Sequence, residues 1–236
     1  EGLSVATSQD GLYWSEPESV VMRQQVNRGA AVDPSVVELP DGRLRMYFFG
    51  SEVTQGDPAS ADGAHAIYSA ISADGRTFTG EPGIRFSMEE ITDPEVFRVG
   101  HEWWMLLSAG QETWLAHSPD GLTFTLDEQV RVWGGVPGGV VLPDGAVRVF
   151  TTDPDGIVSS LLIPAAHPTV EDEPGLRIER TEGLVADPAC VRRLDGTYYL
   201  VFKKRPRSTQ RPPHEFLSPA RSPHYPSNVF LRQYSS

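Results

Sequence analysis

"AVDPSVVELPDGRLRMYFFG" occupies residues 31–50, and a second stretch with the same plan, "ITDPEVFRVGHEWWMLLSAG", occupies residues 91–110. Each begins near an Asp-Pro pair, continues through a short apolar run, passes a turn that contains Gly, and ends in an aromatic-rich run. Two further copies begin at Val136 ("VPGGVVLPDGAVRVF") and at Asp187 ("DPACVRRLDGTYYLVF"). Runs rich in Val, Tyr, Phe and Trp on both sides of an Asp-Gly turn are typical of β-hairpins. The chain is therefore built on an internal repeat.

A second repeated element lies between the copies of the first. Its pattern is Ser-x-Asp-Gly-x-x-aromatic, found at residues 8–14 ("SQDGLYW"), 72–78 ("SADGRTF") and 118–124 ("SPDGLTF"). Each instance follows a β-like run, so we interpret it as another hairpin turn, whose Ser and Asp side chains bond to the turn backbone. The aromatic residue is expected to pack between neighbouring sheets. The third repeat lacks this turn, and the fourth has "HEFLSPARSP" in its place.

Together the two elements predict the fold. The repeats begin roughly 40–60 residues apart, the range for a four-stranded propeller blade, and helical periodicity is weak throughout. We predict an all-β chain with one domain over residues 1–236: a five-bladed β-propeller of four-stranded antiparallel blades. The last blade is expected to be closed by both termini, with residues 224–236 as the closing strand or as a tail. Four blades are the alternative.

The composition narrows the classes of partner. The formal net charge is -12, and so acidic a surface repels phosphate backbones and anionic lipid, which argues against nucleic acid and membrane partners. No apolar run approaches the roughly 20 residues that span a bilayer. The basic stretch 203–211 ("KKRPRSTQR") is interpreted as an exposed loop, or else as a site for an anionic group. Cys190 is the single cysteine, so no disulfide framework is expected. Localisation stays open, with a secreted or periplasmic location preferred, and a monomer is expected.

The repeats also predict a site. In a propeller the innermost strand of every blade lines a central channel, so equivalent positions of the repeats form a ring around its mouth. Asp33, Asp93 and Asp187 occupy one such position, and Val136 occupies it in the third copy. Converging carboxylates raise one another's pKa, and glycoside hydrolysis needs one protonated and one ionised carboxyl group. The alternative is architectural, since Asp before Pro is a common way to begin a strand.

These motifs resemble those of the five-bladed propeller glycosidases, the superfamily of arabinanases, β-xylosidases and fructosidases, over roughly residues 3–221. The resemblance implies that Asp33 is the catalytic base and that Asp93 is the second Asp, which tunes pKa and orients the substrate. Such enzymes place a Glu acid at a Glu-Gly-Pro-like strand start on a later blade, where this chain has Val136-Pro137-Gly138. Glu95, on the same strand face as Asp93, could substitute, with Glu89 and Glu90 as alternatives. The resemblance therefore indicates a divergent or inactive member.

Four residues complete the predicted site as substrate-binding groups: Asp187, Arg28, His65 and Trp104. No metal or other cofactor is predicted. The six histidines lack ligand spacing, and no acidic loop has the spacing of a Ca²⁺ site, although an axial Ca²⁺ would suit so acidic a chain. Two functions follow. One is a glycoside hydrolase-like protein that acts on a glycan in a carboxylate-lined axial pocket. The other is a non-catalytic propeller that binds carbohydrate or a protein partner.

Overall fold

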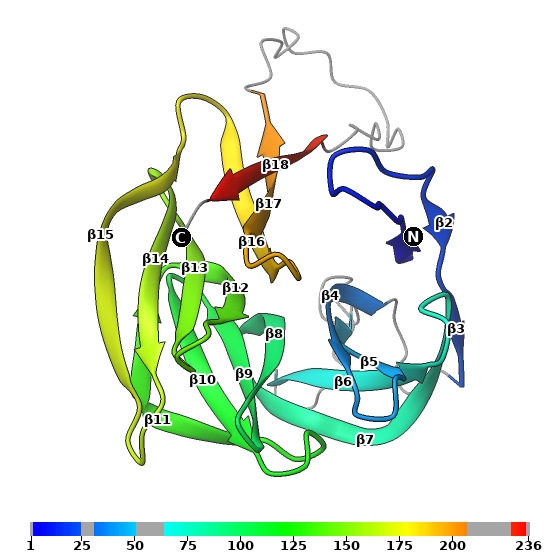
Figure 1. Cartoon of the computed structure of the whole chain (residues 1–236). Helices are drawn as coiled ribbons and strands as arrows, with labels where there is room; N and C mark the ends of the chain where they lie inside the picture. Colours follow the sequence, from blue (N-terminus) through cyan, green and yellow to red (C-terminus); the bar gives the residue numbers. More distant parts are fainter. Residues whose placement is uncertain (1, 25–30, 51–63, 207–227, 235–236) are drawn as a thin grey trace, which may run out of the picture.

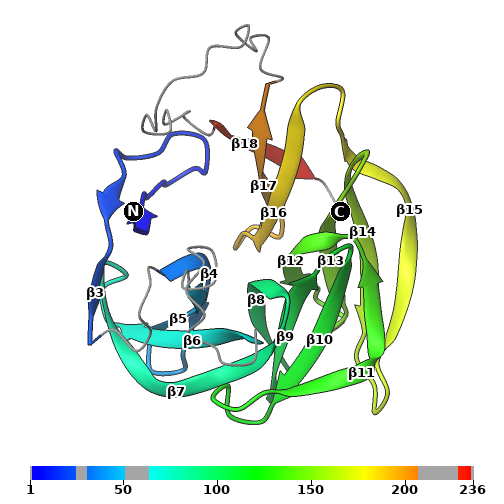
Figure 2. The same cartoon turned by 180° about the vertical axis from the view of Figure 1, so that it is seen from behind.

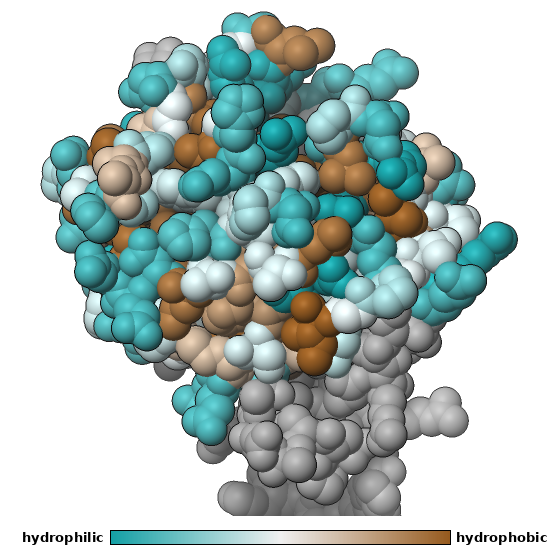
Figure 3. Space-filling view, turned by 90° about the horizontal axis from the view of Figure 1, so that it is seen from below, coloured by the Kyte–Doolittle hydropathy of each residue, from teal (hydrophilic) through white to brown (hydrophobic). Residues whose placement is uncertain are grey.

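The computed structural model describes residues 2–24, 31–50, 64–206 and 228–234, and their regular secondary structure consists entirely of strands (Figure 1). Within these ranges there is no helix that is long and apolar enough to cross a membrane. The prediction of an all-β propeller is confirmed. In the face shown in Figure 3, hydrophobic residues form separate patches among hydrophilic ones.

Three consecutive sheets each contain four antiparallel strands in the order expected for propeller blades, and the first of them has a fifth, parallel strand. The first sheet contains β4 (Ala31–Glu38), β5 (Leu44–Gly50), β6 (Ala64–Ser72) and β7 (Thr77–Glu89), with the short β3 (Val21–Arg23) parallel to β7. The second contains β8 (Ile91–Val99), β9 (Glu102–Ala109), β10 (Glu112–Ser118) and β11 (Thr125–Trp133). The third contains β12 (Gly135–Val141), β13 (Val147–Asp153), β14 (Gly156–Ile163) and β15 (Thr169–Glu179).

The two ends of the chain enter separate sheets. The fourth sheet contains β16 (Leu184–Arg192), β17 (Tyr198–Arg205) and β18 (Asn228–Tyr234), while β1 (Ser4–Val5) and β2 (Glu18–Ser19) form a two-stranded sheet. We expected the C-terminal tail to join the N-terminal strands in the fifth blade. Instead β18 pairs with β17 from Tyr198 to Lys204, because that edge of β17 offers a full row of backbone partners.

The first strand of each sheet lies nearest the axis. β4 packs against β8, β8 against β12, and β12 against β16, so the four inner strands follow one another around the centre (Figures 1 and 2). Spacing at the axis is tight. A Cβ on Gly138 in β12 would meet the carbonyl oxygen of Pro188 in β16 at 2.0 Å. Glycine at this position lets the third and fourth blades approach each other.

The hydrophobic core is divided among the interfaces between blades. Successive side chains of a strand point to opposite faces, so each second strand serves both of its neighbours. In β9, Leu107 packs with Tyr47 of the first sheet, whereas Leu106 packs with Val149 of the third. A third cluster joins the third and fourth sheets.

The Ser-x-Asp-Gly turns form as expected, and their aromatic residue is buried at Phe78 and Phe124, but the prediction of a buried ring was wrong for Trp14, which is 51% exposed. In the second blade, Gly121 donates its backbone N–H to Ser118 Oγ over 2.9 Å, and Ser118 Oγ donates to Asp120 Oδ1 over 2.9 Å. Asp120 Oδ1 also accepts the backbone N–H of Leu122 at 2.8 Å. The same bonds recur in the turns that begin at Ser8 and Ser72. The predicted structural role of these Ser and Asp side chains is confirmed.

Candidate active site

The repeated Asp-Pro position is a β-bulge in every inner strand. Pairing with the second strand shifts register at the same point in all four blades, which leaves two residues outside the ladder. Proline fits there because it has no N–H to donate to a neighbouring strand. The bulged pairs are Asp33-Pro34, Asp93-Pro94, Val136-Pro137 and Asp187-Pro188.

The first residue of each bulge has a left-handed backbone. The φ angle is 49° at Asp33, 48° at Asp93, 50° at Val136 and 54° at Asp187. Asp is among the few residues other than Gly that adopt this conformation at low cost, whereas a β-branched Val there is strained. Asp-Pro therefore has an architectural role, but as a bulge inside each strand and not as the way the strand begins. The bulge also turns four equivalent side chains out of the pairing pattern, so it does not exclude a functional role.

The aspartates of the first, second and fourth blades interact through their charges. Asp33 is exposed on one side and partly buried on the other. Its pKa is raised to about 6, mainly by this burial and then by the negative charges of Asp93 and Asp187. Burial is also the main cause of the raised pKa of Asp93, to which Asp187 adds and which a hydrogen bond from Thr92 opposes. Such mutual effects require closely spaced groups. The three blades therefore bring their carboxylates together.

A lysine neutralises part of this charge. Lys203 Nζ in β17 lies 2.5 Å from Asp187 Oδ2, and its charge lowers the pKa of both Asp33 and Asp93. The interpretation of Lys203 as part of an exposed loop was wrong for residues 203–205, which belong to β17; residues 207–211 lie outside the described part. The corresponding residues of the other blades are Phe49, Ser108 and Thr152. An alignment of the second strands would have placed Lys203 beside the ring.

Glu95 is bound between two blades. Its Oε1 accepts the backbone N–H of Gly139 in β12 at 3.2 Å, and burial raises its pKa to about 7. Ser35 occupies the equivalent position in β4, and its Oγ accepts the N–H of Val96 in β8 at 2.9 Å. Glu95 therefore has a structural partner in addition to any chemical role. The alternatives Glu89 and Glu90 are exposed at the connection between β7 and β8.

The remaining predicted residues, His65, Trp104 and Arg28, have different outcomes. His65 donates from Nδ1 to the carbonyl oxygen of Ile91 at 2.7 Å, two residues before Asp93, and its ring lies 5.1 Å from that of Phe49. Trp104 is only 2% exposed and packs between the second and third sheets, so its ring has no free face for a sugar. This corrects the prediction of Trp104 as a substrate-binding residue. Arg28 lies outside the described residues.

The other tryptophans near the candidate site differ in their exposure. Trp103 is 6% exposed, so neither residue of the Trp pair in β9 is a surface platform. Trp133 is 55% exposed and donates from Nε1 to Asp153 Oδ2 at 2.8 Å. In the part of the chain that the structure describes, no group of three or more His, Cys, Asp or Glu side chains is arranged to hold a metal ion.

Comparisons with known proteins agree with this architecture. No protein-family model and no curated protein sequence matches the chain. An endo-1,4-β-xylanase from Bacteroides thetaiotaomicron superposes with a TM-score of 0.62 at 14% identity, over 86% of this chain and 76% of that one. A family 43 β-xylosidase/α-arabinofuranosidase from a compost metagenome superposes with a TM-score of 0.54 at 12% identity, over 72% and 69% of the two chains.

The chain has the fold of the family 43 glycoside hydrolases. An exo-β-1,3-galactanase from Phanerochaete chrysosporium has it too, with a TM-score of 0.57 at 11% identity over 87% of this chain. The chain spans only 48% of the length of that galactanase. The structural resemblance predicted from the repeats is therefore confirmed at low sequence identity.

Proposed function

We propose that the axial carboxylate ring binds a glycan and hydrolyses a glycosidic bond in it. The observation that carries this proposal is the convergence of Asp33, Asp93 and Asp187, which three blades present from equivalent bulges. Likeness to glycosidases of the same fold supports it. In this proposal Asp33 is the base, Asp93 orients the substrate, and Asp187 with Lys203 binds sugar hydroxyl groups.

The proposed proton donor differs from the one that the family resemblance implies. The third blade presents Val136 at the ring position, so it offers no carboxyl group there. Glu95 has a pKa of about 7, which suits a group that must hold a proton near neutral pH. We assign the role of proton donor to Glu95 in the state described above, in which one of its carboxyl oxygens accepts the N–H of Gly139.

These assignments predict a pH profile. A base must be ionised, so activity should rise as the pH increases through about 6, the pKa of Asp33. An acid must be protonated, so activity should fall as the pH increases through about 7, the pKa of Glu95. The kcat/KM of the wild-type protein, measured from pH 4.5 to pH 9, should give a narrow bell. A plateau that extends above pH 8 would remove Glu95 from this role.

The function is tested by turnover. Wild type, Asp33→Asn and Asp93→Asn are assayed on aryl β-xylosides, α-arabinofuranosides and β-galactosides, together with xylan and β-1,3-galactan. Loss of the base is expected to lower kcat/KM by at least about 100-fold. The matched control is Asp41→Asn, because Asp41 is an exposed Asp in the β4–β5 turn. Equal activity in all four proteins would contradict the proposed site.

A second candidate function is glycan binding without hydrolysis. Val136 favours it, since an apolar residue stands where the resemblance implies a Glu acid. Binding of xylotriose and β-1,3-galactotriose is measured by calorimetry in the same four proteins. Binding that is weakened by Asp33→Asn, with no turnover of any substrate, assigns the binding function. Absence of both binding and turnover would contradict both candidates.

A further inference from the structure

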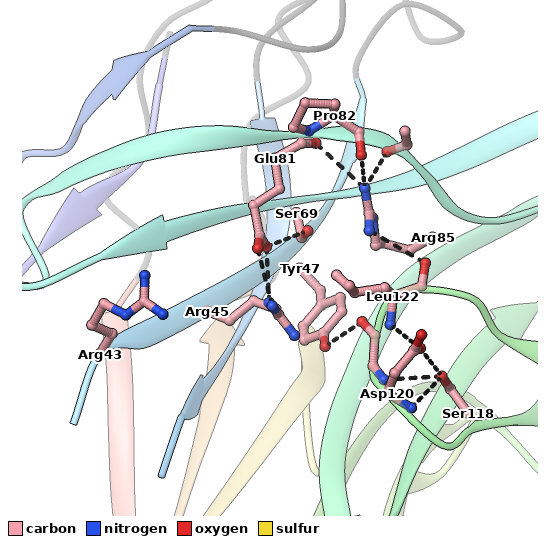
Figure 4. Close-up of polar contacts among 12 residues, drawn as sticks. Arg43, Arg45, Tyr47, Ser69, Glu81, Pro82, Arg85, Ser118, Asp120 and Leu122 are labelled. Atoms are coloured by element: carbon pink, nitrogen blue, oxygen red, sulfur yellow. Dashed lines mark hydrogen bonds and ion pairs between the residues drawn. The ribbon is translucent and has the colours of Figure 1, made fainter. Parts of the chain in front are cut away.

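The interface between the first and second blades is filled by a Ser-x-Asp-Gly turn (Figure 4). Tyr47 donates its hydroxyl to the carbonyl oxygen of Gly121 at 2.8 Å, and its ring meets that of Phe124 edge-on at 5.9 Å. From the outer strand of the first blade, Arg85 Nη1 donates to the carbonyl oxygen of Leu122 at 3.3 Å. Tyr47 is fully buried, and Arg85 is 5% exposed. The turn therefore closes this interface.

The wall that receives this turn is repeated in the third blade. In the first blade, Glu81 accepts two hydrogen bonds from Arg45, at 2.8 and 3.0 Å, and one from Ser69 at 2.8 Å. In the third blade, Glu173 accepts two from Arg148, at 2.8 and 2.9 Å, and one from Ser159 at 2.7 Å. The sequences around the two acceptors, "EPGIR" and "EPGLR", place Arg177 at the position of Arg85.

Aromatic residues on both walls are repeated as well. Register against the inner strand places Phe150 of β13 at the position of Tyr47. On the other side, Tyr198 of β17 holds the position of Trp103 in β9. The third and fourth blades thus carry the same two walls as the first and second blades.

Between these second walls lies a cavity of about 840 Å³, lined by Arg148, Phe150, Glu173, Arg177 and Tyr198, among others. The described part of the fourth sheet ends at β18 and contains neither a Ser-x-Asp-Gly turn nor a fourth strand. The side chains of the two interfaces therefore differ in how far they are exposed to solvent. Trp103 is 6% exposed, whereas Tyr198 at the equivalent position is only partly buried.

We propose that this cavity, called the groove below, is a docking site for a polypeptide segment made of a Ser-x-Asp-Gly-x-x-aromatic turn followed by a β-strand. The aromatic ring would pack against Phe150 and Tyr198, as Phe124 packs against Tyr47. Arg177, which also donates to Ser159 Oγ at 2.8 Å and to the carbonyl oxygen of Pro174 at 3.2 Å, would lie against the turn, as Arg85 lies against Leu122. The strand that follows would pair with β18, which has no second partner strand among the described residues, by the β-strand addition that other peptide-binding domains use.

The test uses a peptide taken from the chain itself. Residues 118–133 ("SPDGLTFTLDEQVRVW") contain the turn and the outer strand of the second blade. The labelled peptide is titrated with the folded protein, and saturable binding by fluorescence anisotropy is expected. The matched peptide Phe124→Ser should bind at least about 10-fold more weakly, because it lacks the ring that fills the cavity.

Protein variants locate the binding site. Arg177→Ala and Tyr198→Ala should each weaken binding of the 118–133 peptide at least about fivefold, whereas Arg180→Ala, which replaces an exposed arginine directly after the same strand, should not. If either groove variant fails to fold, the two peptides still decide the question on the wild-type protein. Absence of saturable binding, or equal binding of both peptides, would overturn the proposal. Self-association that Tyr198→Ala abolishes and the peptide does not displace would assign the groove to a second copy of the chain and would also overturn it.

Discussion

At the scale of single residues, the ring aspartates combine two demands in one side chain. The bulge needs a residue that adopts a left-handed backbone at low cost, and Asp meets this need. The proposed chemistry needs a carboxylate at the mouth of the channel, and Asp33 meets this second need. The combination has a cost, because carboxylates brought together disfavour one another's ionised form.

This cost predicts a gain of stability on removing the charge. Asp33 has a folded pKa of about 6, above its ordinary value of 3.8, so folding favours its protonated form. Its contribution to stability is therefore greatest at low pH and is lost as the pH rises through about 6. Asp33→Asn should raise the free energy of unfolding at pH 7.5, and the gain should shrink towards pH 4.5. Urea denaturation at the two pH values measures it, and a gain that grows at low pH would contradict the linkage.

Val136 permits a test of the strain at the ring. Its φ of 50° is unfavourable for a β-branched residue, and Asn tolerates this region much better. Val136→Asn should increase the free energy of unfolding by about 1 kcal/mol. The control Val191→Asn replaces a Val that is 55% exposed and lacks positive φ, and it should give no gain. Equal effects of the two substitutions in a denaturation series would show that the strain at Val136 is negligible.

At the scale of elements, the turns are as important as the strands. The Asp of each Ser-x-Asp-Gly turn accepts backbone N–H groups, which lowers the pKa of Asp74 to about 2 and the pKa of Asp120 below its ordinary value. The Gly that follows must have a positive φ, and in the second blade it also lies against two aromatic side chains. This turn therefore both folds locally and joins neighbouring blades.

Substitution of two glycines can distinguish the local folding of a turn from its contact with the neighbouring blade. A Cβ on Gly121 would meet Trp103 and the Tyr47 hydroxyl at 2.8 Å, whereas a Cβ on Gly42 would meet nothing within 4 Å. Both have positive φ, 72° and 81° respectively. Gly42→Ala should therefore cost only the backbone penalty, about 1 kcal/mol. Gly121→Ala should cost about 3 kcal/mol, because it also forces the aromatic contacts apart. Thermal and urea denaturation compare the two variants, and similar losses would contradict the importance of this contact.

At the scale of the whole molecule, packing is uneven around the axis. Buried clusters join each pair of neighbouring sheets from the first to the fourth, but the interface of the third and fourth sheets also contains the cavity of about 840 Å³. Side chains that line a cavity lack packing partners on that side, and this lowers local stability. Backbone amides of β16 and β17 should therefore exchange hydrogen at least about tenfold faster than those of β8 and β9. Mass spectrometry of peptide fragments measures this, and uniform protection of all four strands would contradict it.

How much the sequence could predict differs between features. The Asp-Pro pairs and Asp-Gly turns are local signals, so they correctly predicted the blades and the four equivalent ring positions. The burial of Trp104 and the hydrogen bond of Glu95 to Gly139 depend on which strand face meets which neighbour, and no local pattern states this. Lys203 was missed because a charge inside a strand resembles a charge in a loop until its partner strand is known. The partner strand of β18 depends on which sheet edge binds it more strongly, and this is known only once the other strands are in place.

The left-handed bulge has a practical consequence for mutagenesis. Alanine scanning, the usual first survey of a site, would remove the carboxylate at Asp33, Asp93 or Asp187 and would at the same time place an unsuitable residue on a backbone that Ala rarely adopts. Any lost activity would then combine two causes. Asparagine replaces the carboxylate and accepts the same torsion angles, so only a scan with amides can attribute a loss of activity to the missing charge.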